Sequence, residues 1–372
     1  MPSQVSLTQT AQRPVQMRAV LRPMMPSLPE DWYRGAAWLQ LLRPLSALFQ
    51  WLARRRQAIH CQQQLPGRLP VIVIGNITVG GTGKTPVVIA LTKWLESCGY
   101  RVAVLSRGYG ASPSTLPYNV ESGCQPEQCG DEIAMMRHHL SGVIMIDPDR
   151  RRALAALDQR DDCDIVISDD GLQHYRLRRD IEWVVIDGSR GLGNGYCLPA
   201  GPLREPAQRL QDVDEILING QWRASRSRQQ SGLATVSEKT HEFVLQPAYW
   251  VNVKTAEQVS LSAGVERFQQ DDIQAIAGIG NPQRFFQTLA DLGLTVTSRA
   301  FADHYPFQPE DLAAWQHKLL LMTEKDAVKC QPFASENWWY LHVAAVIPEE
   351  LTDRLLARVQ GLLTDMNNSA WT

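Results

Sequence analysis

Residues 71–86 read Val71-Ile-Val-Ile-Gly75-Asn76-Ile-Thr78-Val-Gly80-Gly81-Thr82-Gly83-Lys84-Thr85-Pro86. The opening run is apolar and β-branched, which is typical of a strand buried on both faces of a sheet. A glycine-rich turn and Lys-Thr follow, and residues 87–95 then have the apolar periodicity of a helix. A strand, a glycine-rich turn, Lys-Thr and a helix in this order predict a phosphate-binding P-loop.

The residue types of this loop suit a bound phosphate. Glycines let backbone N–H groups curl around the phosphate, Lys84 can reach the β- and γ-oxygens, and Thr85 can hold Mg²⁺. The usual pattern has glycine where this chain has Thr78, so the stretch is a variant loop. A glycine-rich turn that binds nothing is the alternative. We expect the nucleotide to contact Thr78, Gly80, Gly81, Thr82, Gly83, Lys84 and Thr85.

The following sequence alternates short apolar runs with helical stretches. This alternation predicts a doubly wound α/β domain with a mainly parallel sheet, the P-loop domain, over residues 61–234. Residues 221–242 are polar and are interpreted as a connection, and a second, smaller α/β domain is expected over 235–350. Residues 351–372 are expected to hold a helix end and a tail. The expected strands are 71–74, 102–105, 143–146, 165–167, 183–186 and 215–218, then 243–245, 273–278, 294–297, 319–322 and 339–346, with a helix at about 283–292.

Acidic residues end several of the expected strands. A P-loop needs a second Mg²⁺ anchor, and Asp169 and Asp170 follow the strand at 165–167. Asp131 and Glu132 open a helix, where carboxylates also serve as caps, so the functional and the capping interpretations both stay open. Asp147 and Asp187 end strands too, and their spacing does not rank them. Arg204 can clamp phosphate oxygens or form an ordinary loop salt bridge.

The N-terminal region differs from the rest. Residues 1–31 have no periodicity and are expected to be a mobile leader, whereas residues 32–60 predict an amphipathic helix that Pro44 kinks or splits. Arg43 and Pro44 in its middle argue against a membrane span. Tryptophans and the Arg54–Arg56 run favour a helix lying at a membrane surface, with a core-packing helix as the alternative.

Composition excludes several classes of protein. The 372 residues suffice for about two domains. The 37 basic and 39 acidic residues give a net charge of −2, which argues against a nucleic-acid partner. Seven cysteines form no CxxC pair, so reduced thiols of a cytoplasmic protein are expected instead of a disulfide framework.

Eight segments together resemble the tetraacyldisaccharide 4′-kinases, the lipid A kinases of Gram-negative bacteria. The resemblance implies a P-loop kinase with two α/β domains and an N-terminal helix peripheral at the cytoplasmic face of the inner membrane. It also implies transfer of the ATP γ-phosphate to the 4′-hydroxyl of a tetraacylated glucosamine disaccharide 1-phosphate. No obligate protein partner is evident. The segments are GNITVGGTGKTP (75–86), LSRGYG (105–110), CGDE (129–132), SDDGLQH (168–174), GPLREP (201–206), AIAGIGNPQRFF (275–286), FADHYPF (301–307) and LMTEKDAVK (321–329).

The resemblance also implies residue roles. Asp131 matches the catalytic base and His304 its partner from the second domain, while Lys84 and Thr85 match the phosphate and Mg²⁺ residues. Glu132, Asp169 and Asp170 match the acidic groups for metal and substrate, Gln173 and His174 complete that motif, and Arg204 and Glu205 match a pair near the site. This chain departs from the family pattern in having Tyr305 for a second histidine and Ile133 for a proline.

Two other functions are compatible with a P-loop. A membrane-associated NTPase switch acting on a protein partner would be expected to carry a guanine-specificity element such as NKxD. The nearest string, residues 323–326, has its lysine one place too late. A soluble small-molecule kinase would not need the tryptophan- and arginine-flanked N-terminal helix.

Overall fold

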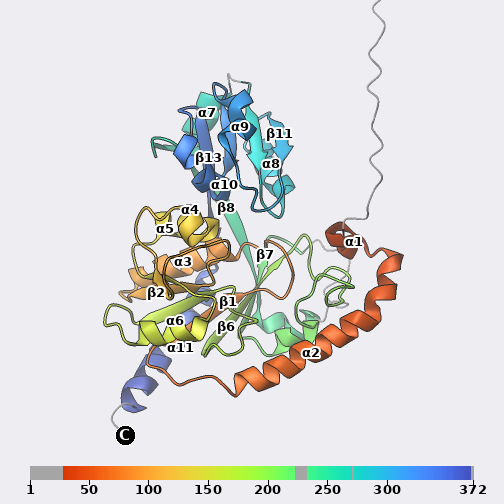
Figure 1. Cartoon of the computed structure of the whole chain (residues 1–372), viewed down its shortest axis with the longest axis vertical. Coiled ribbons are helices and arrows are strands. Elements are labelled where there is room, and N and C mark those ends of the chain that lie inside the picture. Colours follow the sequence, from red (N-terminus) through yellow and green to blue (C-terminus); the bar gives the residue numbers. More distant parts are fainter. Residues whose placement is uncertain (1–27, 223–232, 270–271, 370–372) are drawn as a thin grey trace, which may run out of the picture.

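A computed structural model describes residues 28–222, 233–269 and 272–369. Its strands form a mostly parallel sheet in the order β11-β10-β12-β13-β8-β7-β6-β1-β5-β2-β4-β3, and β9 pairs with β8. Figure 1 shows two lobes stacked along the long axis, with β8 (Thr240–Asn252) rising from the lower lobe into the upper one. The predicted class, a P-loop-like α/β fold with a second α/β unit, is confirmed.

The lower lobe is centred on β1 (Val71–Gly75), which lies between β5 (Ile165–Asp169) and β6 (Ile181–Asp187), parallel to both. All of these strand residues are buried, as the unbroken apolar runs predicted. The remaining elements of this lobe are β2 (Val102–Ser106), β3 (Tyr118–Asn119), β4 (Ile144–Ile146), β7 (Glu215–Asn219), α3 (Lys84–Ser97), α4 (Pro126–Cys129), α5 (Asp131–His139), α6 (Arg150–Asp158), η2 (Ala207–Gln211) and η3 (Leu233–Lys239).

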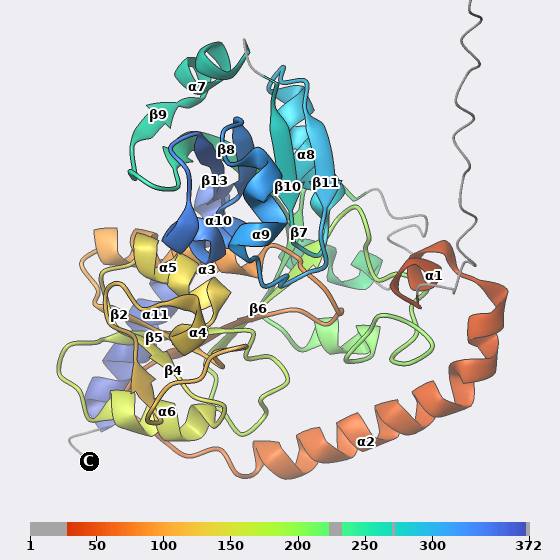
Figure 2. The same ribbon diagram turned by 45° about the horizontal axis from the view of Figure 1, so that its top comes forward.

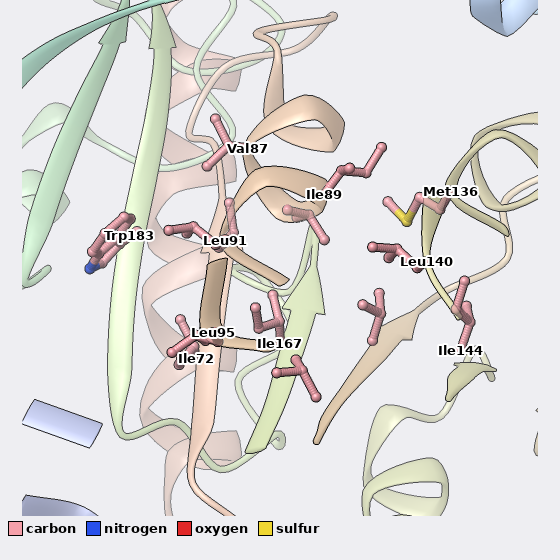
Figure 3. Close-up of a cluster of buried hydrophobic side chains, with 14 of the residues drawn as sticks. Ile72, Val87, Ile89, Leu91, Leu95, Met136, Leu140, Ile144, Ile167 and Trp183 are labelled. Atoms are coloured by element: carbon pink, nitrogen blue, oxygen red, sulfur yellow. The ribbon is translucent and has the colours of Figure 1, made fainter. Parts of the chain in front are cut away.

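Each face of the lower sheet has its own hydrophobic core. Successive β1 residues point to opposite faces, so Ile72 packs with Leu91 and Leu95 of α3, whereas Val73 packs in the core that contains Leu157 of α6. Figure 3 shows the first of these cores, in which α3 side chains lie between the strands and α5. The P-loop is therefore held between a buried strand and a buried helix.

The upper lobe has the expected α/β pattern. Strand β8 pairs with β7 through its first residues and with β13 (Trp338–Val346) through the rest, so one strand joins the two lobes. Figure 2 shows this lobe above the ends of β6 and β7. Its other elements are β9 (Gln258–Ser260), β10 (Gln274–Ala277), β11 (Thr297–Ala300), β12 (Leu320–Thr323), α7 (Leu261–Phe268), α8 (Pro282–Asp291), α9 (Pro309–Leu312), η4 (Ala313–Trp315), α10 (Glu324–Cys330) and η5 (Gln331–Phe333).

Two details of the sequence interpretation were wrong. The polar connection ends earlier than residue 242, because β8 already begins at Thr240. The strand expected at 294–297 lies at Thr297–Ala300 instead. Gly293 ends α8 with φ +85°, and the N–H of Leu294 donates to the Leu289 carbonyl at 3.0 Å. Leu294 is thus the buried apolar residue of a Schellman motif and not the start of a strand.

The N-terminal helix is split close to Pro44, as this proline predicted. Helix α1 (Leu28–Arg34) is followed by a 3-10 turn, η1 (Ala37–Leu42), and then by α2 (Arg43–Cys61), with Pro44 in its first turn. The last residues of the expected leader thus belong to α1, and residues 1–27 lie outside the described residues. Figure 2 shows α2 along the outer edge of the lower lobe.

The C-terminal residues return to the lower lobe. Helix α11 (Glu349–Ser369) places Leu351, Leu355 and Val359 in the same core as α3. All seven cysteines lie in the described part of the chain, and each is a free thiol there. Among the described helices, none has the length and apolar character needed to cross a bilayer.

Candidate active site

The P-loop joins β1 to α3 in a conformation that needs glycine at Gly83. Gly83 has φ +93°, and a Cβ there would lie 2.6 Å from Nδ2 of Asn219. That Nδ2 donates to the Thr82 carbonyl at 3.0 Å, which fixes the loop from β7. Thr78 forms an isolated antiparallel bridge with Leu203. Thr78 is not among the residues with positive φ, so its backbone does not require the glycine of the usual pattern.

Asp170 follows β5 and faces two cations. Lys84 Nζ lies 3.4 Å from Oδ1, and Arg204 Nη1 lies 3.3 Å from Oδ2. Burial raises the pKa of Asp170, but the charges of Lys84 and Arg204 outweigh burial and bring the pKa to about 2. Its backbone has φ +49°, a left-handed conformation often associated with functional residues. The Asp170 carboxylate is therefore ionised and held beside the P-loop lysine.

Asp169, one residue earlier, has the opposite electrostatics. It is buried, and Arg150 Nη2 donates to its main-chain carbonyl at 2.7 Å. Burial and the nearby charge of Glu132 raise the pKa of Asp169 to about 7. Its Oδ1 has no hydrogen-bond partner among the described residues. A buried carboxylate with an unpartnered oxygen, close to a second carboxylate, has the oxygen donors that suit Mg²⁺.

Asp131 opens α5 and meets His304 from the upper lobe. Asp131 is 7% exposed, and its Oδ2 lies 2.9 Å from Nδ1 of His304. Gly130 makes this position possible, because a Cβ there would lie 2.4 Å from the Tyr109 carbonyl oxygen. The Tyr109 ring in turn lies 5.1 Å from the His304 ring. The predicted pair of carboxylate and imidazole is thus present across the two lobes.

Lys325 sets the direction of the hydrogen bonds of this pair. Its Nζ lies 3.1 Å from Nε2 of His304 and 3.0 Å from Oε1 of Glu132. An ammonium group can only donate, so Nε2 accepts and Nδ1–H donates to Asp131. Burial lowers the pKa of Lys325, but Glu132, Asp131 and Asp303 outweigh burial and raise it. In this arrangement the imidazole of His304 bridges the Lys325 ammonium and the Asp131 carboxylate.

Other residues predicted from sequence contact the side chains of the site. Gln173 Nε2 donates to Glu205 at 2.6 Å, and Gln173 Oε1 lies 3.4 Å from Arg204 Nη1. Burial and Arg150 lower the pKa of His174 to about 4, so this imidazole is neutral. The two remaining strand-end acids make local contacts: Asp147 with Arg152, and Asp187 with Ser189.

The arrangement has the parts of a phosphoryl-transfer site. A P-loop lysine and an arginine can neutralise phosphate charge, a group of carboxylates can hold a divalent cation, and an oriented aspartate can accept a proton.

Comparisons with known proteins agree with this chemistry. The sequence model of the family Tetraacyldisaccharide-1-P 4′-kinase matches residues 38–360. This chain belongs to that family. A tetraacyldisaccharide 4′-kinase of Pseudomonas putida (strain W619) is 48% identical over 321 residues, which cover 85% of this chain and 90% of the relative. One of Alcanivorax borkumensis is 44% identical over 340 residues, which cover 89% of this chain and 97% of the relative.

A solved structure of the 4′-kinase family is also similar. The crystal structure of LpxK from Aquifex aeolicus in complex with ATP has a TM-score of 0.64 and 27% sequence identity. The match covers 87% of this chain and 99% of that chain. The resemblance inferred from the sequence motifs is therefore confirmed.

Some residues of this candidate site had no assigned role from sequence. Lys325 stands in a charged string after a strand, and only its contacts with Glu132 and His304 show its place. Arg284 of α8 in the upper lobe donates to Oδ1 of Asn219 at 2.7 Å. Asn219 is the residue whose Nδ2 donates to the Thr82 carbonyl of the P-loop. Both residues lie within motif segments, but a motif does not show what a side chain touches.

Proposed function

We propose that this chain transfers the γ-phosphate of ATP to the 4′-hydroxyl of a tetraacylated glucosamine disaccharide 1-phosphate in lipid A biosynthesis. The observation that carries the proposal is the Asp131–His304 pair, which joins two lobes at 2.9 Å beside a P-loop. Family membership at 44–48% identity over most of the chain supports the same substrate.

In the proposed reaction, Asp131 accepts the proton of the sugar hydroxyl as its oxygen bonds to the γ-phosphorus. The bond from that phosphorus to the β-phosphate oxygen breaks, and ADP leaves. His304 keeps Asp131 oriented through Nδ1–H, while Lys84 and Arg204 stabilise the phosphate charge. General-base help of this kind supplies about 10²–10⁴-fold in rate.

Mg²⁺ is proposed to neutralise the triphosphate charge when bound. The ligand set we propose is Thr85, Glu132, Asp169 and Asp170. The unpartnered Asp169 Oδ1 and the proximity of Glu132 to Asp169 support this choice. ATP is proposed to contact the P-loop residues Thr78, Gly80, Gly81, Thr82, Gly83, Lys84 and Thr85.

Closure of two domains is proposed to complete the site. The base belongs to the proposed domain 61–234, and its partner histidine to the proposed domain 235–350. Because Asp131 and His304 meet only where the lobes meet, substrate binding and lobe closure are coupled in this proposal.

Helix α2 is proposed to bind the cytoplasmic face of the inner membrane, where an acylated substrate resides. Its Ser46 faces the protein and donates to the Cys197 carbonyl at 2.8 Å. Leu45, Leu48 and Trp51 point away, with 53%, 53% and 56% of each exposed. A core-packing helix would bury these side chains, whereas a peripheral membrane helix exposes them.

The first test is phosphoryl transfer from γ-labelled ATP to the tetraacylated disaccharide 1-phosphate, with Mg²⁺ in mild detergent. Labelled lipid is expected from the wild type and only a trace from Asp131→Asn. Bound and hydrolysed ATP without labelled lipid, with substrate confirmed as dispersed, would contradict the kinase and favour an NTPase switch.

Flotation with phosphatidylethanolamine–phosphatidylglycerol vesicles tests the membrane surface. The double variant Leu48→Gln/Trp51→Gln is expected to lose flotation and keep the wild-type Tm, because both side chains are exposed. Val346→Gln is the matched control, since Val346 is also exposed but lies on β13. Unchanged flotation of the double variant would contradict membrane docking through α2.

A further inference from the structure

Three buried titratable side chains meet between the lobes, away from the phosphate site. Glu324 opens α10, His139 ends α5, and His342 lies on β13. Oε2 of Glu324 lies 2.8 Å from Nδ1 of His342, and Oε1 is hydrogen-bonded to Nε2 of His139. The three side chains are only 8–9% exposed. One carboxylate therefore engages imidazoles from both lobes.

We propose that the His139–Glu324–His342 cluster is an interdomain latch that positions the catalytic pair, an inference that rests on the proposed function. Lys325, the residue after Glu324, contacts Glu132 at the N-terminal end of α5. Glu324 contacts His139 at the C-terminal end of the same helix. Two consecutive residues of α10 thus engage both ends of α5.

The spacing shows why this double contact defines the position of α5. Glu132 and His139 are about 10 Å apart along the helix axis, at about 1.5 Å per residue. A single contact would allow α5 to pivot, whereas contacts at both ends fix its direction relative to α10. Asp131 at the start of α5 and Lys325 on α10 are consequently held at the distances that orient His304.

The electrostatics of the cluster favour a closed latch. Burial raises the pKa of Glu324, but hydrogen bonds from His139 and His342 outweigh burial and bring the pKa to about 2. Each carboxylate oxygen has an imidazole partner, and the Tyr249 ring stacks on His342 with centroids 4.7 Å apart. His138 and Tyr340 also lie within electrostatic range of Glu324. Removing one imidazole leaves a buried anion incompletely paired, so the lobes lose this contact.

The latch is tested in the full-length protein with a matched pair of variants. His139→Ala removes the side chain that contacts Glu324 from α5, and His139→Arg supplies a guanidinium donor to Glu324 in its place. We expect kcat for lipid phosphorylation to fall about 10–100-fold in His139→Ala, because a small misplacement of reacting groups has an effect of this size. The KM for ATP is expected to stay near that of the wild type, and His139→Arg to recover most of the rate. His317→Ala, an exposed histidine outside the cluster, is the control.

Hydrogen exchange tests the latch independently of activity. In Glu324→Gln, faster exchange is expected in α5 and α10 while α3 keeps its protection. Unchanged exchange, or failure of His139→Arg to recover the rate lost in His139→Ala, would overturn the latch. One equivalent of tightly held zinc in the purified protein would also overturn it, since two histidines and a glutamate would then be metal ligands. If the wild type itself labels no lipid, the proposed function fails, and the exchange result still decides the latch.

Discussion

Two pairs of adjacent carboxylates line the site, and they are held in different ways. Asp169 and Asp170 contact cations of their own lobe. The main-chain carbonyl of Asp169 accepts from Arg150, and the carboxylate of Asp170 pairs with Lys84 and Arg204. Asp131 and Glu132 instead contact His304 and Lys325 of the upper lobe. The first pair is complete within one lobe, whereas the second is complete only when both lobes meet. In the proposed reaction, the P-loop lobe would therefore supply most contacts to the nucleotide phosphates, whereas the base would also need the upper lobe.

The largest expected effect comes from the P-loop lobe. Lys84→Ala removes the cation beside Asp170 and the expected partner of the ATP phosphates, so lipid phosphorylation should fall by about 10³-fold or more. The Tm should stay close to that of the wild type, as measured by calorimetry. Turnover near the wild-type rate would remove the P-loop from the mechanism.

Asp131→Asn tests most directly whether the two carboxylate pairs have different roles. The amide keeps the size of the side chain but is a poor proton acceptor, so single-turnover transfer should slow by about 10²–10⁴-fold. ATP affinity, measured by titration calorimetry, should change little, because Asp131 is not among the proposed nucleotide or Mg²⁺ ligands. Loss of ATP affinity with an intact chemical step would instead make Asp131 a nucleotide or metal ligand.

Lys325→Met tests the contribution of the upper lobe to the second pair. His304 Nε2 loses its donor and Glu132 loses its cation, so kcat should fall about tenfold, with little change in the KM for ATP. Lys318→Met is a suitable control, since Lys318 pairs with Asp272 at the surface. Equal effects of the two substitutions on kcat would show that Lys325 has no specific role.

The smallest expected effect is on stability and concerns His174, close to the first pair. Its pKa of about 4 in the folded protein lies below the usual 6.5. As pH falls, His174 therefore binds a proton in the unfolded chain before it does so in the folded protein. The free energy of unfolding that depends on His174 is present above about pH 6.5 and is lost as pH falls toward about 4. Denaturant titrations should show a weaker decrease over this window in His174→Gln than in the wild type. Identical slopes would contradict the depressed pKa.

Local sequence patterns predicted the P-loop lobe well. Its six main strands were recognisable because residues of a parallel sheet are buried on both faces and read as unbroken apolar runs. Strand β8 was less visible, since half-exposed residues along much of its length interrupt the apolar pattern. Leu294 was misassigned because an apolar residue after a helix can close a Schellman motif as well as begin a strand.

The chemical groups that the protein carries can be recognised from its sequence patterns: a glycine-rich loop with Lys84, two carboxylate pairs, a histidine in a second α/β unit and an amphipathic helix. Folding established which of these groups touch. It brought His304 to Asp131, 173 positions away, and gave the adjacent Asp169 and Asp170 opposite pKa shifts. It also turned the apolar side of α2 away from the protein. The physical reason is that burial and Coulomb interactions depend on distance in space, whereas a motif records only distance along the chain.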